Sequence, residues 1–227
     1  MLTLHPEKPS LGTMNDSTSP TIAQAHQLAH TWGARPIFGP LDLVIPAGVT
    51  LVQGDEQTGK STLLRILAGE LAPTGGWIDV KGCRSDEHPR AFAQAVFRTD
   101  PLNTSLDQTS PTAWFDTLPE RYPLLNKSLL VDLVESFDLN THLHKPLYML
   151  SAGSRRKVWL SAAFASGAAL TLIDQPFAAL DGPSMRLLRE VLQDFSRQTA
   201  RACLLADYEP PSDISLASTI EMPHPRT

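Results

Sequence analysis

Apolar residues recur at every second position, or in short unbroken runs, along six segments of the chain. This pattern predicts β-strands, which place alternate side chains on opposite faces of a sheet. The six segments are 21–32, 41–45, 49–52, 77–80, 170–173 and 202–206. The unbroken run Leu170–Ile173 is typical of a strand that is buried on both faces, as in a parallel sheet.

Other segments repeat their apolar residues every three or four positions, which predicts helices. They are 63–71, 114–118, 129–137 and 183–195, and the largely apolar stretch from 151 to 165 is expected to be one buried helix. We therefore expect an α/β fold with a mostly parallel core sheet and an antiparallel β part near the N-terminus. Between about 85 and 150 helical patterns and prolines replace the strands, which predicts an inserted helical subdomain.

Both ends of the chain are polar and show neither the strand pattern nor the helix pattern of apolar residues. Residues 1–20 are rich in proline and serine, and we expect them to form a disordered tail. Met1 and Met14 are both candidates for the true start. Residues 21–210 are expected to form a single domain, and residues 211–227 a loose C-terminal tail.

Composition narrows the class of protein without identifying it. With 227 residues, 42% hydrophobic and 19% charged, the chain resembles an ordinary soluble globular domain. The net charge of −5 and the pI near 5.8 give no reason to expect a nucleic-acid partner. The two cysteines, Cys83 and Cys203, lack metal-binding spacing and suit a reducing compartment. We see no signal peptide, and the longest apolar stretch, 158–173, is short for a membrane span.

The strongest chemical signal is the segment 54–62, which reads G-D-E-Q-T-G-K-S-T. It fits the pattern G-x-x-x-x-G-K-[ST] and lies between a predicted strand and a predicted helix, as a phosphate-binding loop requires. Gly54 and Gly59 allow the tight backbone whose N–H groups surround phosphates, and Lys60 reaches the β- and γ-phosphates. The Ser61 hydroxyl is expected to ligate Mg²⁺, and Thr62 is expected to bind the nucleotide with the rest of the loop. The alternative is a glycine-rich turn that binds no nucleotide.

A second anchor for Mg²⁺ is expected at the end of a buried strand. Asp174 follows Leu170–Ile173, and such a carboxylate points to the sheet edge where α/β proteins bind ligands. An aspartate that merely caps a turn is the alternative. The presence of Lys60 in the same chain favours the metal ligand.

Two further motifs identify the family that the chain resembles. Leu150–Ser154 reads L-S-A-G-S, and L-T-L-I-D-Q-P-F-A-A-L-D follows at the distance of one helix and one strand. With the phosphate loop and the helical subdomain in the same order, the chain is similar to the ATPase subunit of an ATP-binding cassette (ABC) transporter. The resemblance covers residues 21–208 and implies a P-loop NTPase fold of the ABC type.

The resemblance also implies partners and further site residues. Two cassettes, identical or different, would pack head to tail around two ATP molecules with Mg²⁺, and Ser151 and Gly153 would contact the γ-phosphate bound by the partner cassette. Trp32 stands where the family places an aromatic ring that stacks on adenine, although a position in the core is equally compatible with its sequence. The helical subdomain would contact a transmembrane subunit, so the expected location is cytoplasmic, on the inner face of the membrane. Substrate and direction of transport are not visible in the sequence.

The chain departs from the family at its catalytic positions. Gln175 stands where the family has the glutamate that acts as general base; an amide cannot accept a proton, although it can orient water. Asp207 is expected at the place of a histidine that contacts the γ-phosphate, and Arg98 or Thr99 at the place of a glutamine.

These departures leave two hypotheses for activity. The first is an ATPase subunit with weakened hydrolysis that drives a bacterial-type transporter, with Lys60, Gln175 and Asp207 as catalytic residues. The second is a hydrolysis-deficient regulatory subunit that binds nucleotide beside an active cassette. A soluble cassette in DNA repair or translation is disfavoured by the acidic charge and by the single cassette.

Overall fold

The computed structural model describes residues 19–223, and its first sheet is antiparallel. The strand order in this sheet is β2-β1-β4-β5. The strands are β1 (Thr21–Trp32), β2 (Arg35–Pro46), β4 (Gly75–Val80) and β5 (Cys83–Arg84). The predicted N-terminal tail lies outside the described residues up to residue 18. The expected antiparallel part is thus present.

The second sheet is parallel throughout, with the order β6-β7-β8-β3-β9. Its strands are β3 (Gly48–Gln53), β6 (Val96–Arg98), β7 (Leu170–Asp174), β8 (Ala202–Asp207) and β9 (Leu216–Glu221). Parallel strands need crossover connections, which here are helices or longer segments. The α/β class and the parallel core sheet predicted from the periodicity are confirmed.

Period-two alternation divides the core between the two faces of the parallel sheet. In β8, Cys203 and Leu205 pack on one side with α5 (Ala152–Ala165) and α6 (Gly182–Phe195). Leu204 and Ala206 pack on the opposite side with α1 (Lys60–Leu67) and the antiparallel sheet. Because both faces are covered, the strand reads as a continuous apolar run.

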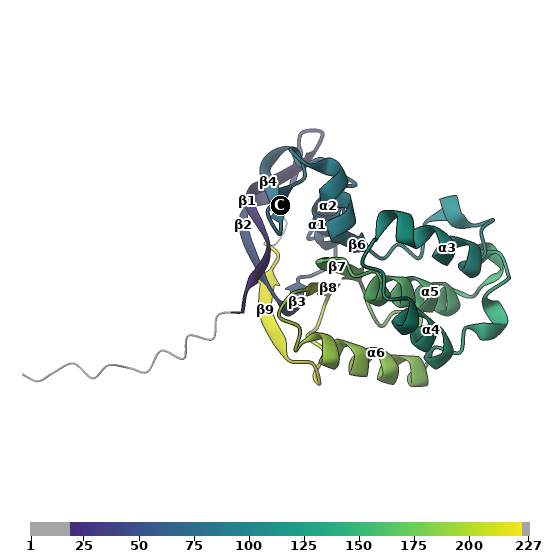
Figure 1. The fold of residues 1–227 in the computed structure, drawn as a ribbon. Coiled ribbons are helices and arrows are strands. Elements are labelled where there is room, and N and C mark those ends of the chain that lie inside the picture. Colours follow the sequence, from purple (N-terminus) through teal and green to yellow (C-terminus); the bar gives the residue numbers. More distant parts are fainter. Residues whose placement is uncertain (1–18, 224–227) are drawn as a thin grey trace, which may run out of the picture.

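Two of the remaining helices, α3 (Pro111–Arg121) and α4 (Lys127–Ser136), lie together at one end of the molecule. The third, α2 (Pro89–Ala95), lies nearer the antiparallel sheet. Short 3₁₀ turns lie at Thr104–Leu106, Asn140–His142 and Leu147–Met149. Figure 1 shows the antiparallel strands at the opposite end from α3, α4 and α5, with β6, β7, β8 and β3 between them and β9 beside the antiparallel strands. Among residues 19–223, no helix has the length and apolarity needed to cross a membrane.

The helix α5 is buried along most of its length, as its apolar composition predicts. Its residues from Val158 to Ala165 are all buried. Trp159 lies against Trp114 of α3, with 4.4 Å between ring centroids. This contact joins the helical part to the core sheet, because α5 runs from one to the other.

The predicted start of the helical subdomain at residue 85 is wrong. Residues Val96–Arg98 form β6, which pairs with β7 at the edge of the core sheet, and α2 packs on β4, β5 and β6. The helical part therefore begins after Arg98. A three-residue strand has too few positions to establish an alternating pattern, so β6 could not be predicted from periodicity.

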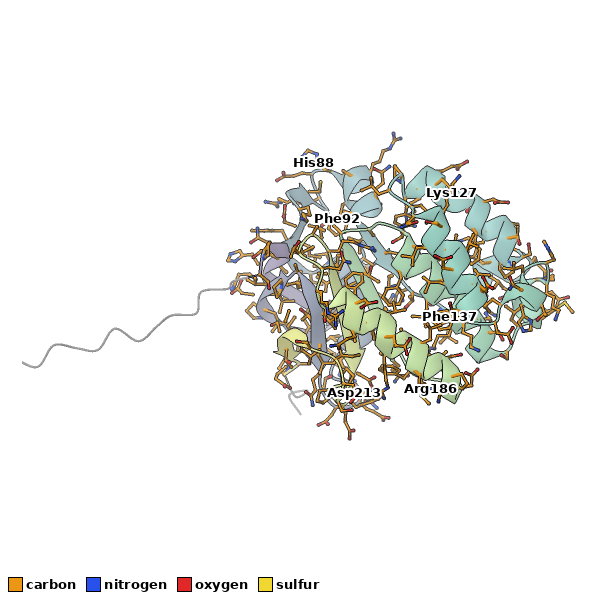
Figure 2. All side chains as sticks on the ribbon, turned by 60° about the horizontal axis from the view of Figure 1, so that its bottom comes forward. His88, Phe92, Lys127, Phe137, Arg186 and Asp213 are labelled. Carbon is orange, nitrogen blue, oxygen red and sulfur yellow. The ribbon has the colours of Figure 1, made fainter. Side chains whose placement is uncertain are left out.

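The predicted loose segment after residue 210 is also wrong in its central part. Leu216–Glu221 form β9, which pairs in parallel with β3, and its residues alternate between half-buried and exposed. Ion pairing helps to fix the approach to this strand, because Arg189 of α6 lies 3.3 Å from Asp213, labelled in Figure 2. Only every second residue of β9 is half-buried, so the strand is largely polar and its composition is similar to that of a loose tail.

Candidate functional site

The phosphate loop connects β3 to α1, and neighbouring atoms leave little room for a side chain at its two glycines. Gly59 has φ +91° and directly precedes α1, and a Cβ at this position would lie 2.8 Å from Cγ2 of Ile37. A Cβ on Gly54 would lie 2.8 Å from Oγ1 of Thr58. Both glycines are therefore required by close approach of neighbouring atoms, and at Gly59 also by left-handed backbone.

Lys60 is the buried cation of the loop, with 7% of its surface exposed. Its Nζ donates to the carbonyl oxygens of Gly54 and, at 2.8 Å, Asp55. The same Nζ lies 4.3 Å from the centre of the Tyr208 ring. The ammonium is thus held within the loop by two carbonyl dipoles and one aromatic face.

A cavity of about 390 Å³ opens over the loop and the first turn of α1. It brings together Lys60, Ser61, Asp174 and Gln175, which come from two segments more than 100 residues apart. Its lining residues are Ile37, Glu56, Gln57, Thr58, Gly59, Lys60, Ser61, Thr62, Asp174, Gln175 and Tyr208.

The residues around this cavity fit a nucleotide phosphate with Mg²⁺. The N-terminus of α1 presents backbone N–H groups and the positive end of the helix dipole, which favour an anion. A hydroxyl from Ser61 and a carboxylate from Asp174 are hard oxygen ligands, and Mg²⁺ commonly takes few protein ligands and completes its shell with phosphates and water. Among residues 19–223, no group of three or more histidine, cysteine or acidic side chains is placed so that it could hold a metal ion by itself.

Gln175 occupies a fixed backbone position at the edge of the cavity. Its φ is +46°, which is uncommon for a residue with a side chain. The backbone N–H of Gln175 donates to the carbonyl of Ala206 at 2.8 Å, and its Nε2 lies 3.4 Å from the hydroxyl of Tyr208. The amide side chain is therefore directed toward Tyr208.

Tyr208 is the site residue that sequence reasoning missed. It lines the cavity, whereas Asp207 does not, and the carboxylate of Asp207 accepts the backbone N–H of Tyr208 at 2.8 Å. The backbone carbonyl of Tyr208 accepts a hydrogen bond from Gln53 at 3.1 Å. The signal that could have found Tyr208 is side-chain alternation: Ala206 and Tyr208 share one face of β8 and its extension, and Asp207 lies on the other.

Arg156 of α5 contacts the end of β7 but does not line the cavity. Its Nη1 donates to the carbonyl oxygens of Asp174, at 3.0 Å, and Gln175. Burial lowers the pKa of the Arg156 guanidinium, while the nearby carboxylates of Asp174 and Asp207 act in the opposite direction. Asp207 thus influences the charge of Arg156 without lining the cavity.

Ser151 and Gly153 do not line the cavity of their own chain. Ser151 is exposed and precedes α5, where its Oγ accepts the backbone N–H of Ser154 at 3.1 Å. A Cβ on Gly153 would lie 2.5 Å from the carbonyl oxygen of Ala179. The N-terminus of α5 is thus packed against the segment that follows β7.

Three other residues that the sequence suggested also lie away from the cavity lining. Trp32 is the last residue of β1 and is 68% exposed, which excludes the core position that its sequence allowed. Arg98 is paired with Glu70 at 2.7 Å and Asp100 at 2.8 Å. Thr99 is buried. A role of Trp32 in stacking on adenine stays a prediction.

The glycine loop between the parallel strand β3 and the helix α1, with an aspartate at the end of β7 in the same sheet, defines a P-loop nucleotide-binding protein. A protein-family model described as ABC transporter matches residues 40–178, which is more than half of the chain. The chain therefore belongs to the ABC transporter family and is an ABC nucleotide-binding domain.

Similar proteins agree with this assignment. A cytochrome c biogenesis ATP-binding export protein, CcmA, from Xylella fastidiosa (strain 9a5c) is 32% identical over 179 residues, covering 78% of this chain and 79% of the relative. A protein of the same name from Cupriavidus pinatubonensis is 30% identical over 187 residues, covering 81% and 82%.

Solved structures show the same fold. The ATP-binding subunit of an ABC transporter superposes with a TM-score of 0.75 at 21% identity, covering 83% of this chain and 80% of the other. A dimeric ATP-binding cassette bound to ADP and Pi gives 0.70 at 16% identity, covering 83% and 88%. The predicted ABC type of the fold is thereby confirmed.

Proposed function

We propose that this ABC transporter ATP-binding subunit binds MgATP at a head-to-tail interface between two cassettes and hydrolyses it slowly. The observation that carries this proposal is the cavity that gathers Lys60, Ser61, Asp174 and Gln175. The exposed position of Ser151, outside the cavity of its own chain, supports a contribution from a second cassette. A similar solved cassette is described as dimeric with ADP and Pi.

Each residue around the cavity has a distinct role in this proposal. Lys60 neutralises the β- and γ-phosphates as a point charge, and the helix N-terminus donates N–H groups to them. Ser61 and Asp174 hold the cation that screens the phosphate charge. Gln175 orients the attacking water by hydrogen bonding, and the hydroxyl of Tyr208, rather than Asp207, contacts the γ-phosphate.

Weakened hydrolysis follows from the acid–base chemistry of these residues. The carboxylates that line the cavity belong to Glu56 and Asp174. Asp174 is assigned to the cation, and Glu56 lies in the phosphate loop itself. An amide at position 175 orients water but takes no proton, and loss of a general base costs about 10²- to 10⁴-fold in rate.

A second candidate function is favoured by the same glutamine. In this alternative the chain binds ATP and stays closed, while a different cassette that has a glutamate performs hydrolysis. The hydrogen bond between Gln175 and Tyr208 supports it, because an amide whose N–H₂ group already has a partner is less available to a water molecule.

The proposed transport role is taken from the named relatives. Both are cytochrome c biogenesis ATP-binding export proteins, so we propose that this chain serves an export system of that kind. A separate transmembrane subunit would bind the helical part of the cassette and choose the substrate. The cassette would then lie on the cytoplasmic face of the membrane.

Steady-state phosphate release and nucleotide titration test this proposal with purified wild type and Gln175→Glu. Slow release by wild type that rises about 10²- to 10⁴-fold with Gln175→Glu supports a site built for hydrolysis with a weakened base. Binding without release by wild type, and release by Gln175→Glu, favours the regulatory alternative. Lys60→Ala is the control for contaminating phosphatases. ATP binding by Lys60→Ala as tight as by wild type would contradict the assigned site.

A further inference from the structure

The first two turns of α5 contact the segment 174–181 at three places. Gly153 packs against the carbonyl of Ala179 so closely that a Cβ would lie 2.5 Å from it. Nζ of Lys157 lies 2.7 Å from the carboxylate of Asp181. Between these contacts, Arg156 donates to the peptide carbonyls at the end of β7. The start of α5 and the segment 174–181 therefore pack closely against each other.

The contact of Arg156 differs from the other two because it reaches the backbone of the proposed catalytic residue. Its Nη1 is shared between the carbonyl oxygens of Asp174 and Gln175, at 3.0 and 2.5 Å. Hydrogen bonds from a charged donor are stronger than those from a neutral one. The carbonyl of Gln175 is thus held by a partly buried guanidinium from the side of α5.

The other backbone group of Gln175 is held from the opposite side. Its N–H donates to the carbonyl of Ala206 at 2.8 Å. A left-handed φ of +46° is costly for glutamine and persists only where surrounding contacts impose it. With both peptide groups engaged, the backbone of Gln175 has one orientation, and that orientation directs its amide to the cavity and to Tyr208.

We propose that Arg156 is a positioning residue for ATP hydrolysis: its guanidinium fixes the left-handed peptide of Gln175 and so aims the amide at the phosphate cavity. The inference rests on the proposed function for its effect on rate, but not for its effect on the backbone. Arg156 does not line the cavity, so nucleotide affinity is expected to be nearly independent of it.

The neighbouring Arg155 provides a matched control on the same helix. It is similarly enclosed, with 16% of its side chain exposed, and it pairs with Asp107 at 2.8 Å and with the carbonyl of Asn103 at 2.9 Å. These contacts lead to the helical part rather than to Gln175. A general effect of removing a half-buried arginine from α5 is therefore measured by Arg155→Met.

The experiment compares wild type with Arg156→Met, Arg156→Lys and Arg155→Met in two independent measurements. Hydrogen exchange reports the protection of the backbone N–H of Gln175. Steady-state phosphate release with ATP titration reports kcat and Kd in the same variants, all of which keep Gln175. Arg156→Lys keeps a charged donor, so it should retain part of the protection. It also keeps the proposal testable if Arg156→Met does not fold.

The expected result is at least about tenfold faster exchange of the Gln175 amide in Arg156→Met, with protection of residues 158–165 unchanged. We also expect kcat to fall about tenfold, Kd for ATP to change less than about twofold, and Arg156→Lys to be intermediate. Unchanged exchange at Gln175, or equal effects from Arg155→Met, would overturn the positioning role. Absence of phosphate release in every variant would instead count against the proposed ATPase, while the exchange data would still decide the role of Arg156.

Discussion

The ammonium group of Lys60 lies 4.3 Å from the centre of the Tyr208 ring, and the hydroxyl of the same tyrosine lies 3.4 Å from Nε2 of Gln175. One aromatic side chain thus contacts both the residue that is expected to bind phosphate and the residue that is expected to orient water. The ring and the hydroxyl of Tyr208 can be separated by mutation, because each makes a different contact.

Replacement of Tyr208 by phenylalanine keeps the aromatic face over Lys60 and removes the hydroxyl. We expect ADP affinity to change less than about twofold and phosphate release to fall about tenfold, since one hydrogen bond to a charged oxygen is lost. Titration with ADP and ATP beside steady-state release measures both effects. Asp207→Asn is the comparison, and a larger loss of release in that variant would show that Asp207, rather than Tyr208, acts on the phosphate.

Gly153 is expected to tolerate no side chain. In Gly153→Ala the added Cβ would lie 2.5 Å from the carbonyl oxygen of Ala179, so the segment after β7 must shift. We expect the free energy of unfolding, measured by urea denaturation, to fall by about 1–3 kcal/mol.

Gly182→Ala is the matched control for this substitution. Gly182 opens α6, and the nearest atom to its Cβ would be Nη1 of Arg186 at 3.7 Å, an ordinary contact. Alanine also restricts the unfolded chain, so the control should be neutral or more stable by up to about 1 kcal/mol. Equal destabilisation by both substitutions would contradict the close packing at Gly153.

Asp181 is expected to stabilise α6 in a pH-dependent way. Its carboxylate accepts the backbone N–H of Ser184 at 2.8 Å and binds Nζ of Lys157 at 2.7 Å. The hydrogen bonds from Lys157 and Ser184 hold the pKa of Asp181 well below its usual range. We expect Asp181→Ala to lower the melting temperature at pH 7 by about 2–4 °C, which corresponds to the loss of one helix cap.

The sign of the pH effect follows from the lowered pKa. Above about pH 5 the carboxylate is ionised in both states, and the full stabilisation is present. At lower pH the unfolded chain binds a proton that the folded protein binds only later, so the stabilisation decreases. The difference in melting temperature between wild type and Asp181→Ala should therefore shrink as the pH falls below about 5. Asp194→Ala, at the exposed far end of α6, should show a small and constant difference.

The two cysteines are expected to differ strongly in reactivity. Cys203 is buried in β8, and burial raises the pKa of its thiol to about 12, whereas Cys83 is partly exposed. Since the thiolate is the reactive form, a thiol reagent at pH 8 should modify Cys83 alone in the folded protein. Mass spectrometry counts the modified thiols, with a urea-denatured sample in which both should react. Rapid modification of Cys203 in folded protein would contradict the packing of β8.

Much of the fold could be predicted because its signals are local. The strands β3, β7 and β8 and the helices α3 to α6 follow from hydrophobic periodicity over five to fifteen residues. The failures involve short or weakly apolar strands. β6 has three residues, and β9 pairs with β3 although about 160 residues separate them in sequence, so neither has a local pattern that identifies its partner.

Some residues of the candidate site could be predicted from local patterns, whereas others could not. Gly59, Lys60 and Ser61 are placed by adjacency in one loop, and Asp174 by the end of a buried strand. Asp207 was expected at the place of the family's histidine from the resemblance, whereas the next residue, Tyr208, is the one that lines the cavity. Because side chains alternate along a strand, that single step exchanges the residue in the cavity for one outside it.

The sequence by itself determined the phosphate loop, its strand and helix, and the family, because these depend on residues close together in the chain. Only the tertiary structure decided that Tyr208 rather than Asp207 lies beside Lys60 in the cavity, that β9 completes the sheet, and that Arg156 holds the peptide of Gln175. Those relationships join segments distant in sequence, and their geometry is set by strand register and helix packing, which a local pattern does not encode.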